Sequence, residues 1–145
     1  MTLVYATDRS DAADIRAHLR ACDAEFHPAL SSRVDLSDYA RKLATHAARF
    51  EAWSGGTLVG LVAVYANAPD RGVAFVSNVS VFPGHTGRGI GQSLMQAAAR
   101  QVRARGFARL ALEVDAQADA ALRLYRRLGF VMLTQGQLCR LELVL

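Results

Sequence analysis

The chain has 145 residues, a length that suits one domain, residues 1–145, and that buries roughly two thirds of the surface its unfolded form would expose. With 52% hydrophobic residues and only three prolines, the composition excludes a disordered or low-complexity chain. The formal net charge of +4 suits an anionic partner. No basic segment is interleaved with stacking aromatic residues, however, so we expect no nucleic acid.

Neither the cysteines nor the apolar segments indicate a metal site or a membrane segment. Cys22 and Cys139 stand far apart with no CxxC spacing and no histidine at a ligand spacing, so we expect buried thiols, no disulfide and no metal. The amino terminus has no basic stretch followed by an apolar core, and the longest apolar run, Leu58 to Ala66, is too short to cross a bilayer. The sequence therefore predicts a cytoplasmic protein with no membrane partner.

The first half of the chain predicts two helices and an antiparallel meander. Ser10 and Asp11 begin a helix that runs to about Asp23, and a second helix begins at Asp35 with apolar residues at helical spacing. A Ser-Gly-Gly turn and a proline-containing loop separate three apolar stretches that are typical of a hairpin followed by a third antiparallel strand. The strands expected in this half are residues 3–6, 50–53, 58–65 and 73–81.

The second half predicts two helices that alternate with strands. Apolar residues recur at helical spacing from Ile90 until Gly106 ends the helix, and the next strand covers residues 110–114. A strand, a helix and a strand in this order predict a right-handed crossover and parallel pairing, which places Val114 near Val81. The remaining elements are a helix at 118–128 and strands at 130–133 and 138–145. The whole pattern predicts an α+β fold with a mixed, mostly antiparallel sheet of six to seven strands and helices on both faces.

A glycine-rich turn leads into the helix that begins near Ile90. Glycines at positions 87, 89 and 91 leave backbone N–H groups uncovered there, and the helix dipole adds partial positive charge. The pattern is not a P-loop, because Ile90 and Gly91 stand where Lys and Ser or Thr are needed, and a dinucleotide fingerprint would require a small residue in place of Gln92. We expect the turn to bind the pyrophosphate of a nucleotide-type cofactor, with Arg88 adding a charged hydrogen bond. A simple tight turn and helix cap is the alternative.

Three ordered motifs resemble those of the GNAT family of coenzyme-A-dependent N-acetyltransferases. They are Val79-Ser80-Val81-Phe82-Pro83, Thr86-Gly87-Arg88-Gly89-Ile90-Gly91 and Leu124-Tyr125-Arg126-Arg127-Leu128-Gly129-Phe130. The second motif departs from the family pattern at Thr86, where the family has Gln or Arg, so the backbone N–H groups and Arg88 remain as the expected phosphate contacts. The resemblance covers nearly the full length and implies the GNAT-like fold, in which the strand ending at Val81 splays from its parallel neighbour.

The resemblance implies acetyl-CoA (coenzyme A) as the cofactor. In the family, the pantetheine arm lies between the splayed strands and pairs with one of them, and a backbone N–H of that strand binds the acetyl carbonyl. The residues expected to contact the cofactor are Val79, Ser80, Val81, Gly87, Arg88, Gly89, Ile90, Gly91 and Gln92. A further departure is Ala118, where the family often has Asn; Gln117 is one position away from replacing it.

The resemblance also implies two catalytic residues. Tyr125 is expected to hold its hydroxyl near the thioester sulfur as the proton source for the departing thiolate, although its spacing alone favours packing in an apolar helix stripe. Glu113 is the candidate general base, since some relatives that act on peptide amino termini have a glutamate at this strand position. A solvated surface carboxylate, with a water chain as the base, is the alternative for Glu113.

The residues that select the acceptor are expected in loops over the rigid sheet, including the final hairpin around Gln135 to Gln137. The candidates for substrate binding are Phe26, Arg33, Tyr39 and Asn78, and Arg33 is able to hold a carboxylate or phosphate. The expected function is transfer of an acetyl group to a primary amine of a small molecule. The sequence leaves open whether the chain forms a homodimer. A protein amino-terminal or lysine acetyltransferase and a non-catalytic acyl-CoA-binding sensor are the alternatives.

Overall fold

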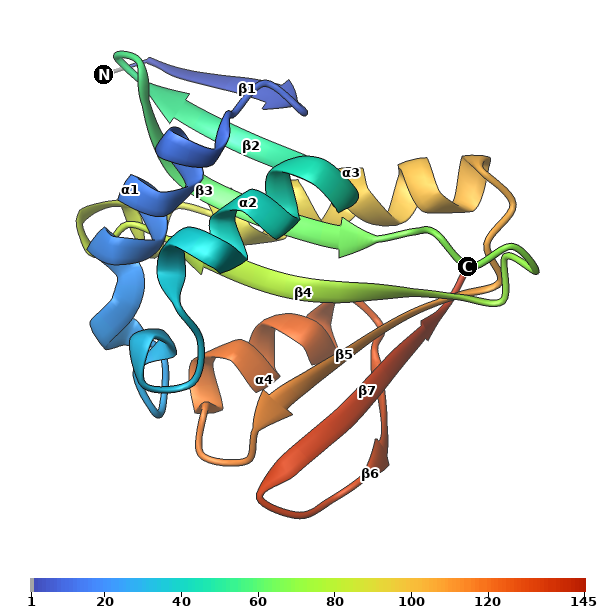
Figure 1. Cartoon of the computed structure of the whole chain (residues 1–145). Coiled ribbons are helices and arrows are strands. Elements are labelled where there is room, and N and C mark those ends of the chain that lie inside the picture. The colour runs from blue at the N-terminus through green and yellow to red at the C-terminus, as the bar shows by residue number, and fades with distance from the viewer. Residues whose placement is uncertain (1) are drawn as a thin grey trace.

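Seven strands form one mixed sheet within residues 2–145, the part of the chain that the computed structural model describes (Figure 1). The strands are β1 (Leu3–Thr7), β2 (Ala48–Ser54), β3 (Thr57–Tyr65), β4 (Val73–Val81), β5 (Arg109–Asp115), β6 (Val131–Thr134) and β7 (Leu138–Val144). Their order in the sheet is β1-β2-β3-β4-β5-β7-β6, and every neighbouring pair is antiparallel except β4 and β5. Met1, the first residue of the expected domain of residues 1–145, lies outside the described residues.

Within the same residues, four α-helices cover the sheet, two on each face (Figure 1). On one face lie α1 (Ala12–Cys22) and α2 (Leu36–His46), and on the other lie α3 (Ile90–Ala104) and α4 (Asp119–Arg127). Short 3-10 turns occupy Asp23–Glu25, Leu30–Ser32 and Pro83–His85. None of the described helices combines the length and the apolar character that crossing a membrane requires. The predicted α+β fold, with a mixed and mostly antiparallel sheet and helices on both faces, is confirmed.

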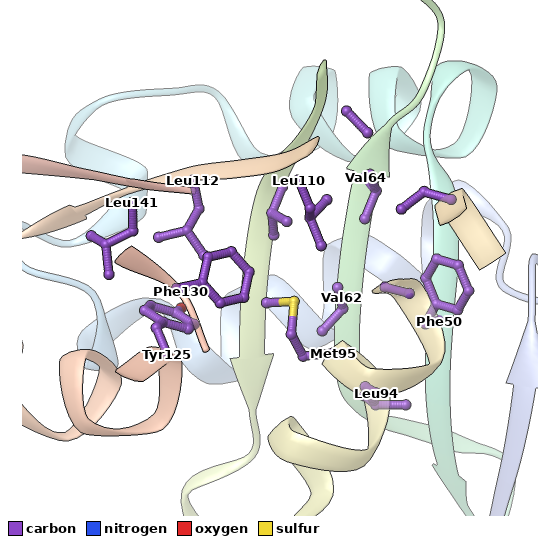
Figure 2. Close-up of a cluster of buried hydrophobic side chains, with 14 of the residues drawn as sticks. Phe50, Val62, Val64, Leu94, Met95, Leu110, Leu112, Tyr125, Phe130 and Leu141 are labelled. Carbon is purple, nitrogen blue, oxygen red and sulfur yellow. The ribbon is translucent and has the colours of Figure 1, made fainter. Parts of the chain in front are cut away.

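Each face of the sheet has its own hydrophobic core. Figure 2 shows the core beneath α3 and α4, where Leu94 and Met95 of α3 pack with Val62 of β3 and Leu110 of β5. The core on the other face is smaller and is built from α1, α2, β2 and β3. Strand β3 is therefore buried on both faces, which explains why it contains the longest apolar run of the sequence.

Acidic side chains cap the first two helices. The Asp11 carboxylate accepts a hydrogen bond from the backbone N–H of Asp14 at 2.8 Å, and the Asp14 carboxylate accepts one from Asp11 at 3.0 Å, which makes a capping box for α1. Asp35 caps α2 with its side chain in a similar way. Ser10, expected to take part in the helix start, is buried instead and donates its hydroxyl to Glu51 in β2.

A buried ion pair in β2 ties both of these helices to the sheet. Arg49 Nε lies 3.6 Å from Glu51 Oε2, and the two side chains are 7% and 0% exposed. The Arg49 guanidinium donates to three carbonyl groups at the C-terminal end of α2 and to the carbonyl of Ser10 just before α1. Glu51 accepts from the backbone N–H groups of Arg9 and Ser10 and from the Trp53 indole. Because hydrogen bonds offset the burial of both charges, the pair fixes α1 and α2 in place.

Strand β4 contains a bulge that changes which side chains face each core. Asn78 pairs with Ala63 and Val76 pairs with Val64, so Ser77 has no partner on β3. Before the bulge, Val76 faces the core beneath α3, whereas after it Val79 packs there and Asn78 turns toward α1 and α2. A bulge shifts the alternation of a strand by one residue. The polar side chains of β4 therefore gather on the face that carries α1.

The parallel strands β4 and β5 are hydrogen-bonded only near their first residues. The paired positions are Val73 with Arg109, Ala74 with Leu110, and Phe75 with Ala111. Beyond them β5 continues along β7, and the two parts of the sheet diverge (Figure 1). The predicted crossover and splayed pair are confirmed. The expectation that parallel pairing brings Val114 next to Val81 is wrong, because the pairing of β4 with β5 ends at Phe75 and Ala111.

Gly60 in β3 allows the first turn of α3 to pack directly on the sheet. A Cβ atom at this position would lie 2.7 Å from Ile90 Cγ2 and 3.2 Å from Leu94 Cδ1. We expect Gly60→Ala to lower the free energy of unfolding by about 1–3 kcal/mol, since an overpacked core must shift. The control is Gly84→Ala, where a Cβ would meet no atom within 4 Å; it should change stability by less than about 0.5 kcal/mol. Equal urea midpoints for the two variants would contradict the close packing.

Candidate active site

A cavity of about 370 Å³ opens where β4 and β5 part. Its walls come from the second half of β4, the end of β5, the inner face of α4 and the segment that follows α1. A second, more open hollow of about 410 Å³ lies between α4 and the connection from β6 to β7, where Gln135 is found. The hollow contains neither candidate catalytic residue, whereas Tyr125 and Glu113 both line the cavity. The cavity is therefore the candidate site.

The glycine-rich turn lies at one end of this cavity, which Thr86 and Gly91 line. Gly87 and Gly89 have φ angles of +77° and +76°, and a Cβ at either would meet no atom within 4 Å, so the turn needs glycine for its backbone and leaves open space above it. The first backbone hydrogen bond of α3 runs from Ser93 N–H to the Gly89 carbonyl at 3.0 Å. Residues 2–145 offer no acceptor to the N–H groups of residues 90–92.

Two side chains of the turn differ in what they contact. Thr86, the departure from the family pattern, donates its hydroxyl to the Pro83 carbonyl at 3.1 Å. Its side chain thus stabilises the turn itself. Arg88 is exposed, so its guanidinium is accessible to a ligand that approaches from solvent.

Tyr125 lies on α4, where it belongs to the core beneath α3 and α4 and also lines the cavity. Its side chain is among Leu112, Phe130 and Leu141 in Figure 2, and its ring centroid is 5.8 Å from that of Phe130. The hydroxyl makes no hydrogen bond to any described residue. Burial raises the pKa of Tyr125 to about 12, so the phenol keeps its proton at neutral pH. Tyr125 is therefore both a packed residue of the core and a residue of the cavity wall, and its phenol is protonated.

Glu113 lines the cavity from β5 and is exposed. Its neighbour Leu112 belongs to the core beneath α3 and α4, so alternation directs Glu113 to the face that carries α1 and α2. Arg140, opposite it on β7, forms its ion pair with Glu142 instead. The Glu113 carboxylate is left unpaired within residues 2–145 and available to a positively charged group in the cavity.

The four candidate acceptor residues do not all reach the cavity. Phe26, Arg33 and Asn78 line it, which brings them together with Glu113 and Tyr125. Tyr39 is absent from the lining; its hydroxyl donates to the Ser77 carbonyl at 3.1 Å and lies 2.5 Å from the Ser77 hydroxyl. Burial raises the pKa of Tyr39, which keeps this hydroxyl protonated. Tyr39 therefore supports the wall of the cavity at the bulge of β4.

His18 is a buried residue beside this wall that the sequence motifs do not reveal. Its Nδ1 lies 2.9 Å from the Leu58 carbonyl, its Nε2 lies 2.8 Å from the Ser80 hydroxyl, and its ring stacks on Phe82. Burial lowers the pKa of His18 to about 4, against the opposing effect of the two hydrogen bonds. The signal in the sequence is positional, since His18 falls on the apolar stripe of α1 with the buried Ile15, Leu19 and Cys22.

Comparison with known proteins extends the resemblance found in the motifs. The model of the acetyltransferase (GNAT) family matches residues 12–130. Over 75 residues the chain is 41% identical to streptothricin acetyltransferase of Streptomyces lavendulae, which covers 52% of this chain and 39% of that protein. Over 89 residues it is 38% identical to mycothiol acetyltransferase of Thermobispora bispora, which covers 59% of this chain and 30% of that protein. The chain thus spans less than half the length of either relative.

Among solved structures, the fold is similar to that of an acetyltransferase from Salmonella typhimurium described with its cofactor acetyl-CoA. The TM-score is 0.79 at 19% identity, and the match covers 99% of this chain and 94% of that chain. At this identity the likeness concerns the fold. It includes the whole sheet and both helix layers, because nearly all of both chains is matched.

The neutral state of His18 predicts a loss of stability in acid. Its pKa falls from 6.5 to about 4 on folding, so the unfolded chain binds a proton below pH 6.5 that the native protein does not bind until about pH 4. Between pH 7.5 and 5.0 we expect wild type to lose about 2 kcal/mol more unfolding free energy than His18→Gln, which cannot titrate. Urea unfolding at the two pH values measures the difference. Equal losses would mean that His18 is not held neutral.

Proposed function

Because this chain belongs to the acetyltransferase (GNAT) family, we propose that it transfers the acetyl group of acetyl-CoA to a primary amine of a small molecule. The observation that carries the proposal is the cavity between β4 and β5, which has the glycine-rich turn at one end and Tyr125 and Glu113 on its walls. The cavity therefore offers an anion-binding turn, a proton donor and a carboxylate within one space.

The turn and the parted strands suit coenzyme A. The unpaired N–H groups at the start of α3, the open space above Gly87 and Gly89, and the exposed Arg88 suit a pyrophosphate. In the second half of β4, the backbone groups that face β5 have no strand partner, since pairing stops at Phe75. These groups are available to the amide groups of a pantetheine arm. Residues 79–81 and 87–92 are accordingly the proposed cofactor contacts.

When bound, acetyl-CoA supplies the acetyl group as a thioester. Tyr125 would be the proton source for the thioester sulfur, a role that requires the proton to stay on the hydroxyl at neutral pH, as burial ensures. Glu113 accepts a proton from the attacking amine, directly or through water. A backbone N–H of residues 79–81 would hold the acetyl carbonyl oxygen by a hydrogen bond. The chain's own groups thus provide the proton donor, the base and the carbonyl contact.

A small-molecule acceptor is supported by the shape and charge of the cavity. The segment after α1 contributes Phe26 and Arg33 to the lining, so the side that carries α1 and α2 is partly closed over the β4 wall. Glu113 and Asp115 place negative charge where an amine would enter, and Arg33 is available to an anionic group of the acceptor. Streptothricin and mycothiol, the small molecules named for two relatives, agree in class with such an acceptor.

Thiol release from acetyl-CoA tests the function directly. The panel contains glucosamine, lysine methyl ester, spermidine and peptides with free amino termini, and CoA binding is measured in parallel by calorimetry. We expect turnover with a small amine and little with peptides. Faster turnover of peptides would favour a protein acetyltransferase, and CoA binding without any turnover would favour an acyl-CoA sensor, the reading that the Thr86 and Ala118 departures encourage.

Removing the Tyr125 hydroxyl tests its proposed role as proton donor. Tyr125→Phe should lower kcat by roughly 10²-fold, since general acid catalysis contributes this much, while the CoA dissociation constant and the unfolding midpoint stay close to wild type. The hydroxyl makes no hydrogen bond to the described residues, so its loss should not weaken the fold. An unchanged kcat would assign Tyr125 to packing alone.

A further inference from the structure

The segment that joins α1 to α2 forms one wall of the cavity (Figure 1). It contributes Glu25, Phe26, His27 and Arg33 to the lining. Phe26 is partly buried and the other three are exposed, so little packing of their own holds these side chains in place. Whatever fixes the backbone of this segment therefore decides the shape of that wall.

The segment contains two 3-10 turns, and each turn has backbone hydrogen bonds within itself. In the first turn the Phe26 N–H donates to the Asp23 carbonyl at 3.3 Å, and in the second the Arg33 N–H donates to the Leu30 carbonyl at 3.0 Å. Leu30 is 6% exposed and anchors the second turn in the core beneath α1 and α2. The first turn, Asp23–Glu25, has no buried residue. It therefore depends on the second turn for its position.

The carboxylate of Asp23 links the two turns. Its Oδ1 accepts a hydrogen bond from the Ser31 N–H at 2.7 Å, and its Oδ2 accepts one from the Ser31 hydroxyl at 2.6 Å. These contacts, the one from the hydroxyl foremost, lower the pKa of Asp23, so the carboxylate is ionised at neutral pH. Hydrogen bonds to an ionised group are stronger than those between neutral groups. We call this pair of contacts the Asp23–Ser31 clamp.

We propose that Asp23 is a positioning residue for the acceptor: by holding Ser31 it fixes the segment between α1 and α2, and with it Phe26 and Arg33 on the cavity wall. The inference rests on the proposed function, since it assigns this wall to the acceptor. Asp23 is absent from the cavity lining, so it acts through the residues that it holds in place. A wall that is in place for only a fraction of the time weakens acceptor binding by that fraction.

The clamp should affect the acceptor and not the cofactor. The proposed cofactor contacts, residues 79–81 and 87–92, belong to β4, the glycine-rich turn and α3, and Tyr125 and Glu113 belong to α4 and β5. None of these residues lies on the segment that Asp23 holds. Loss of the clamp should therefore raise KM for the amine and leave kcat and the CoA dissociation constant within twofold of wild type. A simple loss of folded protein would instead lower the apparent kcat and leave KM unchanged.

Kinetics with the amine that wild type acetylates fastest, among glucosamine, lysine methyl ester and spermidine, test this role. Asp23→Ala should raise KM for the amine roughly tenfold, and Ser31→Ala roughly threefold, because its backbone N–H still donates to Asp23. The double variant should match Asp23→Ala, since the Ser31 hydroxyl has lost its acceptor once the carboxylate is gone.

Asp23→Asn is the conservative variant. Its amide oxygen can accept from the Ser31 N–H and its NH₂ group can donate to the Ser31 hydroxyl oxygen, so KM should stay within about threefold of wild type. An Asp23→Asn variant as impaired as Asp23→Ala would mean that the charge of Asp23 matters and its contacts to Ser31 do not, which would overturn the proposal.

Hydrogen exchange tests the clamp without any turnover. The Ser31 amide should exchange slowly in wild type and roughly tenfold faster or more in Asp23→Ala, because its acceptor is removed. The control is Asp11→Ala, since Asp11 accepts a comparable hydrogen bond from the Asp14 N–H at 2.8 Å, at the end of α1 away from this segment. This control should lower the unfolding midpoint and leave both KM for the amine and the Ser31 exchange rate unchanged.

The possible failures are distinguishable. An Asp23→Ala variant that alters only the unfolding midpoint, as the Asp11→Ala control does, or a double variant in which the two single effects multiply, would overturn the positioning role. An unchanged Ser31 exchange rate in Asp23→Ala would overturn the clamp itself. Wild type that binds CoA but acetylates none of the amines would overturn the proposed function, and the acceptor role of this wall with it.

Discussion

Because β4 and β5 are paired at only three residue pairs, the sheet divides into two parts that diverge beyond Phe75 and Ala111. The rest of the molecule depends on this early end of the pairing. Strand β5 stays paired with β7 along its whole length, so the second part of the sheet keeps its own ladder and follows its own twist. The space between the strands is the cavity, and the backbone of β4 that borders it is left with unpaired groups, which a properly paired parallel sheet would not provide.

Both helix layers are needed to keep the two parts of the sheet in this relation. The core beneath α3 and α4 spans them, with Leu112 and Leu141 from one part and Val62 from the other (Figure 2). On the opposite face, the buried pair of Arg49 and Glu51 holds the ends of α1 and α2 against β2. This anchoring is what allows α1 to bring a buried histidine against β4. The bulge at Ser77 then turns polar side chains of β4 toward α1. Ser80 is an example, since it contacts His18 of α1 and also lines the cavity.

The parts of the candidate site that depend on neighbours in sequence could be predicted. Gly87 and Gly89 adopt positive φ angles in a turn that their own residue type makes possible, and the helix that follows begins at Ile90 where the apolar pattern starts. The start of α1 was predicted to within one residue. The burial of Ser10 was not predicted, because its partner Glu51 lies 41 positions away in the chain. Tyr125 was named as a candidate site residue from the motif that contains it, Leu124 to Phe130. Its position on the cavity wall follows from where α4 packs.

By itself the sequence determined the order and type of the elements, the crossover that makes β4 and β5 parallel, and the family to which the motifs belong. These features depend on periodicity, turns and caps that act over a few residues. Only the tertiary structure decided where pairing between β4 and β5 stops, which residues face the cavity, and what His18 contacts, since Leu58 and Ser80 lie 40 and 62 positions along the chain. Burial then lowers the pKa of His18 and keeps its ring neutral. Burial is a property of the packed molecule, and no local sequence pattern contains it.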